Sequence, residues 1–170
     1  SALIGGALMH EFSWDWRDWN KLAQASLAGH IIECGAQGSG GLFTDWETVP
    51  DWDNIGYPIV ECADDASFVV TKPRDTGGLV SRPSVSEQIL YEIGDPAEYI
   101  LPDVICDFRH VKLEELGEHR VRVSGAAGRE PTSSYKVSAT FQEGYQLEVG
   151  LAIRGIDAVD KAQKTGDALL

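Results

Sequence analysis

The sequence lacks a long hydrophobic run and a surplus of basic residues. No stretch reaches the ~18 consecutive apolar residues of a membrane-spanning helix, and the first residues do not resemble a secretion signal. We therefore expect no membrane partner. Acidic residues outnumber basic ones by 27 to 14, which gives a net charge of −13. Such a surface repels phosphate backbones, so we also expect no nucleic-acid partner.

Paired cysteines are missing as well. Cys34, Cys62 and Cys106 are odd in number, and none forms a C-x-x-C pair. Secreted disulfide frameworks use even numbers of cysteines at closer spacing. The pattern indicates a reducing compartment, and we expect a cytoplasmic protein.

What is present predicts a single domain over residues 1–170 of the α+β class. A chain of 170 residues with 43% hydrophobic content is long enough to bury one core. Residues 1–42 are helical and rich in glycine, with short helices at Ala2–Phe12 and from Trp16 onward, and a helical stretch over Gly29–Gln37. Residues 57–170 mix strands and helices. Both ends look cut, so we expect an internal segment of a larger α/β protein.

Strand signals dominate the later part. Small hairpins are predicted from β-branched residues between turn signals, and a long antiparallel hairpin from strict alternation with a turn at Glu143-Gly144; we expect these strands in a mixed sheet. The small-hairpin strands are Pro58–Cys62 with Ser67–Thr71, and Val111–Leu116 with Arg120–Ser124, while the long hairpin joins Tyr135–Phe141 to Tyr145–Ile153.

Two further helices are predicted. Ser84-Val85-Ser86-Glu87 has the spacing of a capping box, which favours a helix from Ser84 to about Ile93 before Gly94-Asp95-Pro96. A last helix is expected to begin near Ile156.

Several blocks, in order along the chain, resemble the acyclic terpene utilisation (AtuA) family. They are HEFSWDWRDWNKLA, GHIIECGAQGSGG, IGYPIVE, VTKPRDTGGLVS, SVSEQILYEIGDPAEYILPDV and RVRVSGAAGR. The resemblance implies a role in breaking down acyclic terpenes through branched acyl-CoA thioesters, as an enzyme or an enzyme component. It carries no catalytic residues with it.

The first candidate site lies on Gly29–Gln37. If that stretch is helical, His30, Glu33, Cys34 and Gln37 share one face. Imidazole, carboxylate and thiol could serve as catalytic groups, because a neighbouring imidazolium lowers the pKa of a cysteine. The alternative is a purely structural role, with Cys34 as a small buried residue and His30 hydrogen-bonded in the core.

Two glycine-rich loops form the second candidate. Gly40 and Gly41 in one loop, and Thr76, Gly77 and Gly78 in the other, could offer backbone amides to an anionic group, with Lys72 beside the second loop. Neither loop matches a nucleotide-binding motif, and close chain packing explains such glycines equally well.

The predicted helix after Ser84 adds Gln88 and Tyr91, which could line a cleft. Trp46 and Trp52, together with Phe43 and Tyr57, could shape an apolar pocket for a prenyl-like chain or could anchor a loop. We assign Gln37, Gly40, Gly41, Lys72, Thr76, Gly77, Gly78, Gln88 and Tyr91 to substrate binding.

Three functions stay open at this point. The chain could bind a small-molecule substrate such as an acyl-CoA; it could be a non-catalytic interaction module, as a homo-oligomer or with a carboxylase-type subunit; or it could be a metal-dependent lyase or hydrolase built on His30, Glu33 and Cys34. No cofactor motif is present, and we expect no cofactor and no bound metal.

Overall fold

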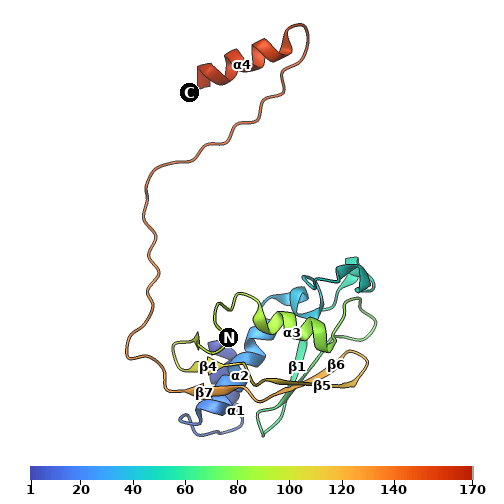
Figure 1. Ribbon diagram of the computed structural model, residues 1–170, viewed down its shortest axis with the longest axis vertical. Coiled ribbons are helices and arrows are strands. Elements are labelled where there is room, and N and C mark those ends of the chain that lie inside the picture. The colour runs from blue at the N-terminus through green and yellow to red at the C-terminus, as the bar shows by residue number, and fades with distance from the viewer. Residues whose placement is uncertain (170) are drawn as a thin grey trace. The chain divides into compact units, whose positions relative to one another are not determined.

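The computed structural model describes residues 1–169. The chain forms two compact units, of which the first is Ser1–Tyr135 and the second begins at Lys136 (Figure 1). The core lies in the first unit, where its buried apolar residues run from Met9 to Ala126. That the two units belong to one domain stays a prediction. No helix within residues 1–169 is long and apolar enough to cross a membrane.

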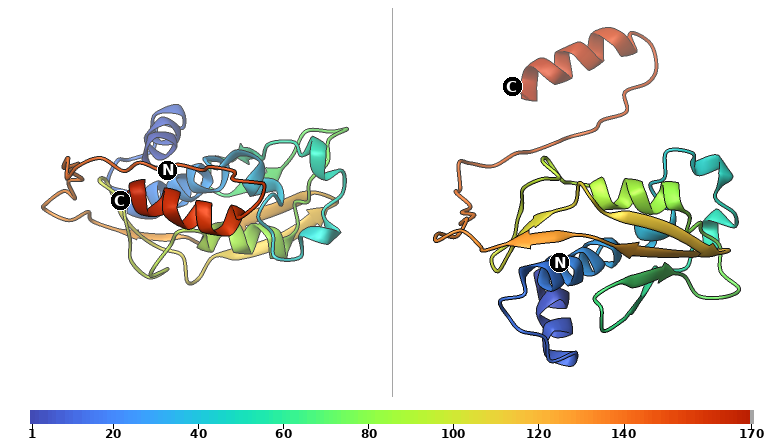
Figure 2. Two further views of the ribbon diagram at one scale, coloured as in Figure 1. Left: turned by 90° about the horizontal axis from the view of Figure 1, so that it is seen from above. Right: turned by 60° about the horizontal axis from the view of Figure 1, so that its bottom comes forward.

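Two packed helices open the first unit. α1 (Ala2–Glu11) confirms the first predicted helix and packs on α2 (Trp19–Ile32). Small residues allow the close approach, since a Cβ on Gly29 would lie 2.8 Å from the backbone oxygen of Ser1. Every residue from Leu22 to Ile31 is buried. α2 is therefore the central element, with α1, α3 (Arg82–Leu90) and β7 (Ala127–Arg129) packed against it (Figure 2).

The strands form two small antiparallel sheets. In the first sheet the order is β1 (Ile59–Cys62), β2 (Phe68–Thr71), β6 (Arg120–Ser124) and β5 (Lys112–Gly117). In the second it is β3 (Tyr99–Ile100), β4 (Ile105–Asp107) and β7. Phe68 pairs with Val123 and Val70 with Val121, and all four side chains are buried. This register turns one face of the first sheet toward the core.

The α+β class is confirmed, and so are both small hairpins, β1 with β2 and β5 with β6. The mixed sheet is wrong, because every pairing between named strands of residues 1–169 is antiparallel. Tight turns join β1 to β2 and β5 to β6, and a connection that short permits only an antiparallel neighbour.

The long hairpin over Tyr135–Ile153 is also wrong. Residues 130–154 contain no strand, and the alternating apolar side chains are exposed, for example Tyr145 at 96% and Phe141 at 80%. Alternation predicts a buried face only where another surface covers it, and a lone two-stranded hairpin is marginal in water. In the second unit the predicted last helix is present as α4 (Ala158–Leu169).

The helix α3 is present, but its N-cap lies three residues earlier than the predicted Ser84. Its N-cap is Ser81, whose hydroxyl accepts the Ser84 amide at 3.3 Å, while the Ser84 hydroxyl accepts the Ser81 amide at 2.9 Å. Pro83 stands in the first turn, where its missing N–H costs nothing. The helix ends at Leu90 rather than Ile93, so Tyr91 is its C-cap.

Candidate functional site

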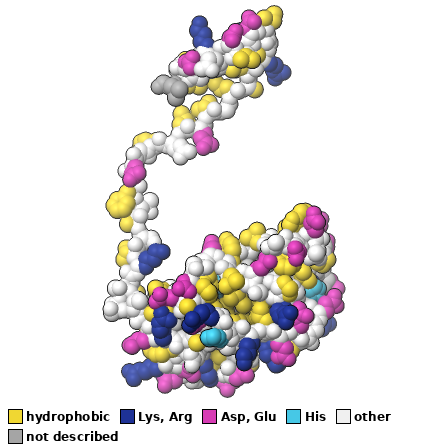
Figure 3. Space-filling view, in the orientation of Figure 1, with side chains coloured by type: hydrophobic (Ala, Val, Ile, Leu, Met, Phe, Trp, Pro, Cys, Tyr) yellow, Lys and Arg dark blue, Asp and Glu magenta, His cyan; other side chains and the backbone are white. Residues whose placement is uncertain are grey.

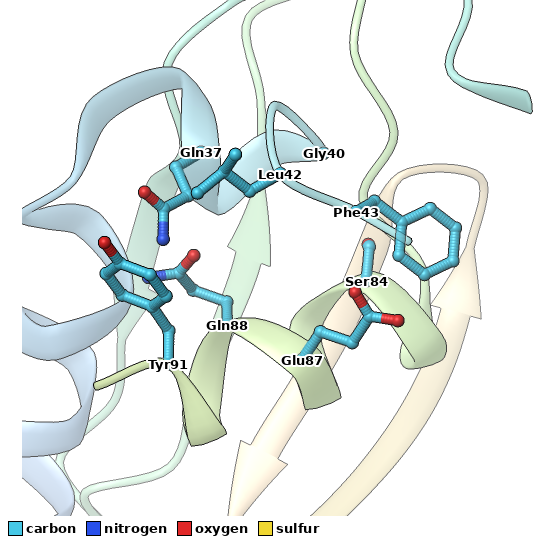
Figure 4. Close-up of a pocket in the computed structure, with 8 residues that line it drawn as sticks. All are labelled: Gln37, Gly40, Leu42, Phe43, Ser84, Glu87, Gln88 and Tyr91. Carbon is cyan, nitrogen blue, oxygen red and sulfur yellow. The ribbon is translucent and has the colours of Figure 1, made fainter. Parts of the chain in front are cut away.

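A cleft of about 210 Å³ opens between α3 and the segment that follows α2. Its walls come from the 3₁₀ helix η1 (Gly35–Ser39), from the loop after it and from α3 with its C-cap. We call it the glutamine cleft. The lining residues are Gln37, Gly40, Leu42, Phe43, Ser84, Glu87, Gln88 and Tyr91 (Figure 4).

The helix α3 presents two faces because of its residue spacing. Val85 and Ile89 enter the core, whereas Ser84, Gln88 and Tyr91, at i, i+4 and i+7, line the cleft. The Ser81 cap fixes where this helix begins and therefore which turn carries Gln88. The predicted pair Gln88 and Tyr91 is thus brought together on one wall.

The two glutamines face each other across the cleft. Figure 4 shows the Gln37 and Gln88 side chains pointing toward one another beside the Tyr91 ring. Gln88 is only 3% exposed, and its Nε2 has no hydrogen-bond partner within residues 1–169; the buried Nε2 of Gln37 has none there either. A buried donor without an acceptor costs about 1–3 kcal/mol. Neither nitrogen has an oxygen acceptor within residues 1–169, although the Gln88 amide lies near the Cys34 thiol and the Gln37 amide near the Tyr91 hydroxyl.

The charged side chains at the cleft are carboxylates. Glu87 lines the cleft, and its Oε2 accepts the Thr44 amide at 2.9 Å. Interaction with the Glu92 carboxylate raises the pKa of Tyr91 above its usual value. No lysine or arginine is among the residues that line the cleft.

The predicted helical face of His30, Glu33, Cys34 and Gln37 does not form. α2 ends at Ile32, and η1 begins at Gly35 after a turn. The reason is Gly35, whose φ of +58° is a left-handed conformation that stops an α-helix. Gln37 is turned into the glutamine cleft, whereas His30 stays in the core at 2% exposure.

His30 bonds to Glu33 rather than to Cys34. Its Nδ1 lies 3.0 Å from Glu33 Oε1. Within residues 1–169, no group of three or more histidine, cysteine, aspartate or glutamate side chains could hold a metal ion.

Cys34 lies close to the cleft but is not activated. Burial, followed by the charges of Glu33 and Glu92, raises the pKa of its thiol, and the nearby Gln88 amide opposes this rise only in part. A nucleophilic cysteine needs a lowered pKa, which comes from neighbouring cations or a helix N-terminus. The arrangement therefore disfavours a thiolate at neutral pH.

The two glycine-rich loops do meet, but they bond to each other. The Leu79 amide donates to Ser39 O at 2.8 Å, and a Cβ on Gly78 would lie 2.8 Å from that same oxygen. The amides of Gly40, Gly41, Gly77 and Gly78 donate to the carbonyls of Gln37, Ala36, Asn54 and Pro50. Close chain packing thus accounts for these glycines, and none of the four amides is left for an anion.

Lys72 lies in a different hollow. A groove of about 670 Å³, which we call the Lys72 groove, also contains Arg74, His119 and Arg120 with the carboxylates of Glu61, Asp75 and Glu118. Lys72 Nζ donates to Thr76 O at 2.5 Å, and Arg120 forms two hydrogen bonds with Glu61. Lys72 and Thr76 are therefore separated from Gln37, Gln88 and Tyr91.

Sequence reasoning missed three residues of the cleft, Leu42, Ser84 and Glu87, whereas Phe43 was expected in an apolar pocket. The capping pattern accounts for Ser84 and Glu87 in the sequence, and Leu42 follows the glycine loop without any motif. The spacing of Ser84 and Gln88, one helical turn apart, was the signal that could have placed Ser84 on the same wall.

The fold and the cleft define an α+β protein with a small polar cleft lined by two glutamine amides. A model of the acyclic terpene utilisation family protein AtuA matches residues 1–170, the whole chain. The chain belongs to the AtuA family. No curated protein and no solved structure matches it.

Proposed function

We propose that this protein acts in the catabolism of acyclic terpenes or branched acyl-CoA thioesters, as an enzyme or an enzyme component, and that the glutamine cleft holds the acyl end of its substrate. Family membership supports the pathway. The observation that carries the site is the unpaired Nε2 of Gln88 in a side chain that is 3% exposed.

The unpaired amide supports ligand binding because natural proteins rarely leave a buried donor unsatisfied. The other buried glutamine of the first unit, Gln24, uses both ends of its amide in hydrogen bonds at 3.1 and 2.8 Å. Gln88 differs from Gln24 in facing a cleft. A ligand acceptor there would remove the cost of the unpaired donor.

The size of the cleft limits what it holds. Pockets for drug-sized ligands are about 300–1,000 Å³, and the glutamine cleft is about 210 Å³. A short branched acyl group fits such a volume, whereas a whole acyl-CoA does not. The nucleotide part of a CoA substrate would therefore lie outside the cleft.

Thermal-shift measurements on the full-length protein test this proposal. Short branched acyl thioesters should raise the melting temperature of the wild-type protein and leave that of Gln88→Leu unchanged. Cys34→Ala and His30→Ala test the catalytic assignment separately, by turnover of the same thioesters. Equal melting curves for wild type with and without every thioester would contradict the proposal.

A second candidate function is a non-catalytic interaction module. Trp46 and Trp52 lie on the 3₁₀ helices η2 (Trp46–Thr48) and η3 (Trp52–Asn54), with their rings edge to face at 5.8 Å, and are 56% and 44% exposed. Exposed tryptophans of this kind are typical of protein interfaces. A carboxylase-type subunit or a second copy of the chain would be the partner.

Co-purification separates the two functions. Trp46→Ala combined with Trp52→Ala should release a partner subunit under the second function and leave thioester binding intact.

The three cysteines are free within the described chain, which supports a reducing compartment, and we propose that the protein works in the cytoplasm.

A further inference from the structure

We infer that the glutamine cleft selects an uncharged acyl carbonyl, as in a thioester, ester or amide, and rejects the corresponding free carboxylate and inorganic phosphate. This inference rests on the proposed function, because it concerns the same cleft.

The hydrogen-bonding groups of the cleft call for an acceptor. Two primary amides, those of Gln37 and Gln88, have Nε2 atoms without a partner in residues 1–169. An amide nitrogen only donates, so the complementary ligand atom is an oxygen with free lone pairs. A carbonyl oxygen has two lone pairs and can accept from both glutamines at once.

The charges around the cleft decide between a neutral and an anionic acceptor. Glu87 is part of the lining, and the Glu33 and Glu92 carboxylates lie close enough to act on Cys34. The lining contains no cation, and Lys72 and Arg74 belong to the separate Lys72 groove. A carboxylate or phosphate would therefore enter a field of its own sign without the arginine or lysine that such groups normally find.

The neutral amides fit the same conclusion. A site for an anion gains most from charged donors, whereas two uncharged amide donors match the partial charge of a carbonyl oxygen. The apolar side chains Leu42 and Phe43 complete the lining and suit the branched hydrocarbon next to that carbonyl.

Calorimetric titration of the full-length protein at pH 7 tests the inference with four probes. They are the N-acetylcysteamine thioester of 3-methylbutanoic acid, its methyl ester, the free 3-methylbutanoate and inorganic phosphate. The thioester and the ester should bind, and the free acid should bind at least about tenfold more weakly. Phosphate should not bind.

Three variants assign the effect to the cleft. Gln88→Leu and Gln37→Leu each should abolish binding of the ester, and Glu87→Gln should raise the affinity for the free acid several-fold. Gln142→Leu, which changes an exposed glutamine of the second unit, is the control and should bind like wild type. Circular dichroism and melting curves verify that each variant is folded. If Gln88→Leu does not fold, Gln37→Leu provides the test of the cleft.

The outcomes separate the inference from the proposed function. Free acid that binds as tightly as the ester overturns the inference and leaves acyl binding standing. Ester that binds in a Gln88-dependent way, without any binding of the thioester, supports the inference and overturns the thioester function. Absence of Gln88-dependent binding for all probes overturns both and leaves a cleft filled only by water.

Discussion

Gln24 Oε1 accepts the backbone amide of Ala126 at 2.8 Å, although the two residues are 102 positions apart in the sequence. The same side chain donates from Nε2 to the Val123 carbonyl at 3.1 Å. These two hydrogen bonds connect α2 to the end of β6 and to the turn that leads into β7. Gln88 is equally buried, at 3% exposure against 4%, but leaves its Nε2 unpaired.

This contrast predicts opposite effects of one substitution. Gln24→Leu should lower the free energy of unfolding by about 2–3 kcal/mol, because it leaves two buried backbone groups unpaired. Gln88→Leu should leave it unchanged or raise it by about 1 kcal/mol, because it removes an unsatisfied donor. Urea denaturation of both variants measures this. A loss of 2 kcal/mol or more in Gln88→Leu would assign Gln88 a structural role.

The elements that the sequence predicts well are those defined by neighbours in the chain. β1 with β2 and β5 with β6 are joined by short turns, so strand signals and turn residues suffice. The start of α3 was misplaced because Ser84-x-x-Glu87 and Ser81-x-x-Ser84 are both capping patterns, and only the second agrees with Pro83 in the first turn. The alternation of apolar and polar residues after Tyr135 does not show whether the apolar side chains are covered, and within the second unit they are exposed.

The site was predicted only in part, for a similar reason. Gln88 and Tyr91 share a helix, and their spacing placed them on one wall. Gln37 was predicted to share a helical face with His30, which requires a continuous helix through Gly35. The left-handed conformation of Gly35 ends that helix, and Gln37 lies in the cleft with Gln88 instead. A contact between segments about 50 residues apart depends on tertiary packing, which local periodicity does not encode.

The packing of the second glycine-rich loop against Asp51 predicts a strong effect at Gly77. A Cβ there would lie 1.9 Å from the Asp51 backbone oxygen, and the Gly77 amide also donates to Asn54 O. Gly77→Ala should therefore cost about 3 kcal/mol of stability. Gly94→Ala is the matched control, since nothing lies within 4 Å of its Cβ position; its melting temperature should equal that of wild type. Equal stability of the two variants would contradict the close contact between Gly77 and Asp51.

Cys34 should react slowly with alkylating agents. Burial and the Glu33 and Glu92 carboxylates raise the pKa of its thiol, and only the thiolate reacts. Mass spectrometry after iodoacetamide treatment at pH 8 should show Cys34 labelled more slowly than glutathione. Glu92→Gln removes one of these charges and should speed the labelling a few-fold. Labelling faster than that of glutathione would instead restore Cys34 as a candidate nucleophile.

Acid should weaken the turn after β4 at a defined pH. Hydrogen bonds from Arg109 hold the pKa of Asp107 at about 2, below the ordinary 3.8. A lowered folded-state pKa stabilises the protein above the unfolded value, so this contribution is complete above pH 4 and disappears as the pH falls toward 2. Asp107→Asn should flatten the decline of the urea midpoint in that window. Asp53→Asn, at an exposed position, should leave the decline as in wild type.

The apolar residues after Tyr135 do not contribute to the core, whose buried members all lie between Met9 and Ala126. Truncation after Tyr135 should therefore leave the melting temperature of the first unit within about 2 °C of the full chain, since about 1 kcal/mol shifts a domain of this size by several degrees. It should also reduce binding of a hydrophobic dye, because side chains such as Phe141 and Leu147 are 80% and 84% exposed. A second truncation before Ala158 removes α4 alone and measures how much α4 contributes to the melting temperature and to dye binding. A clear fall in melting temperature for the longer deletion would mean that the alternating segment covers part of the first unit in solution.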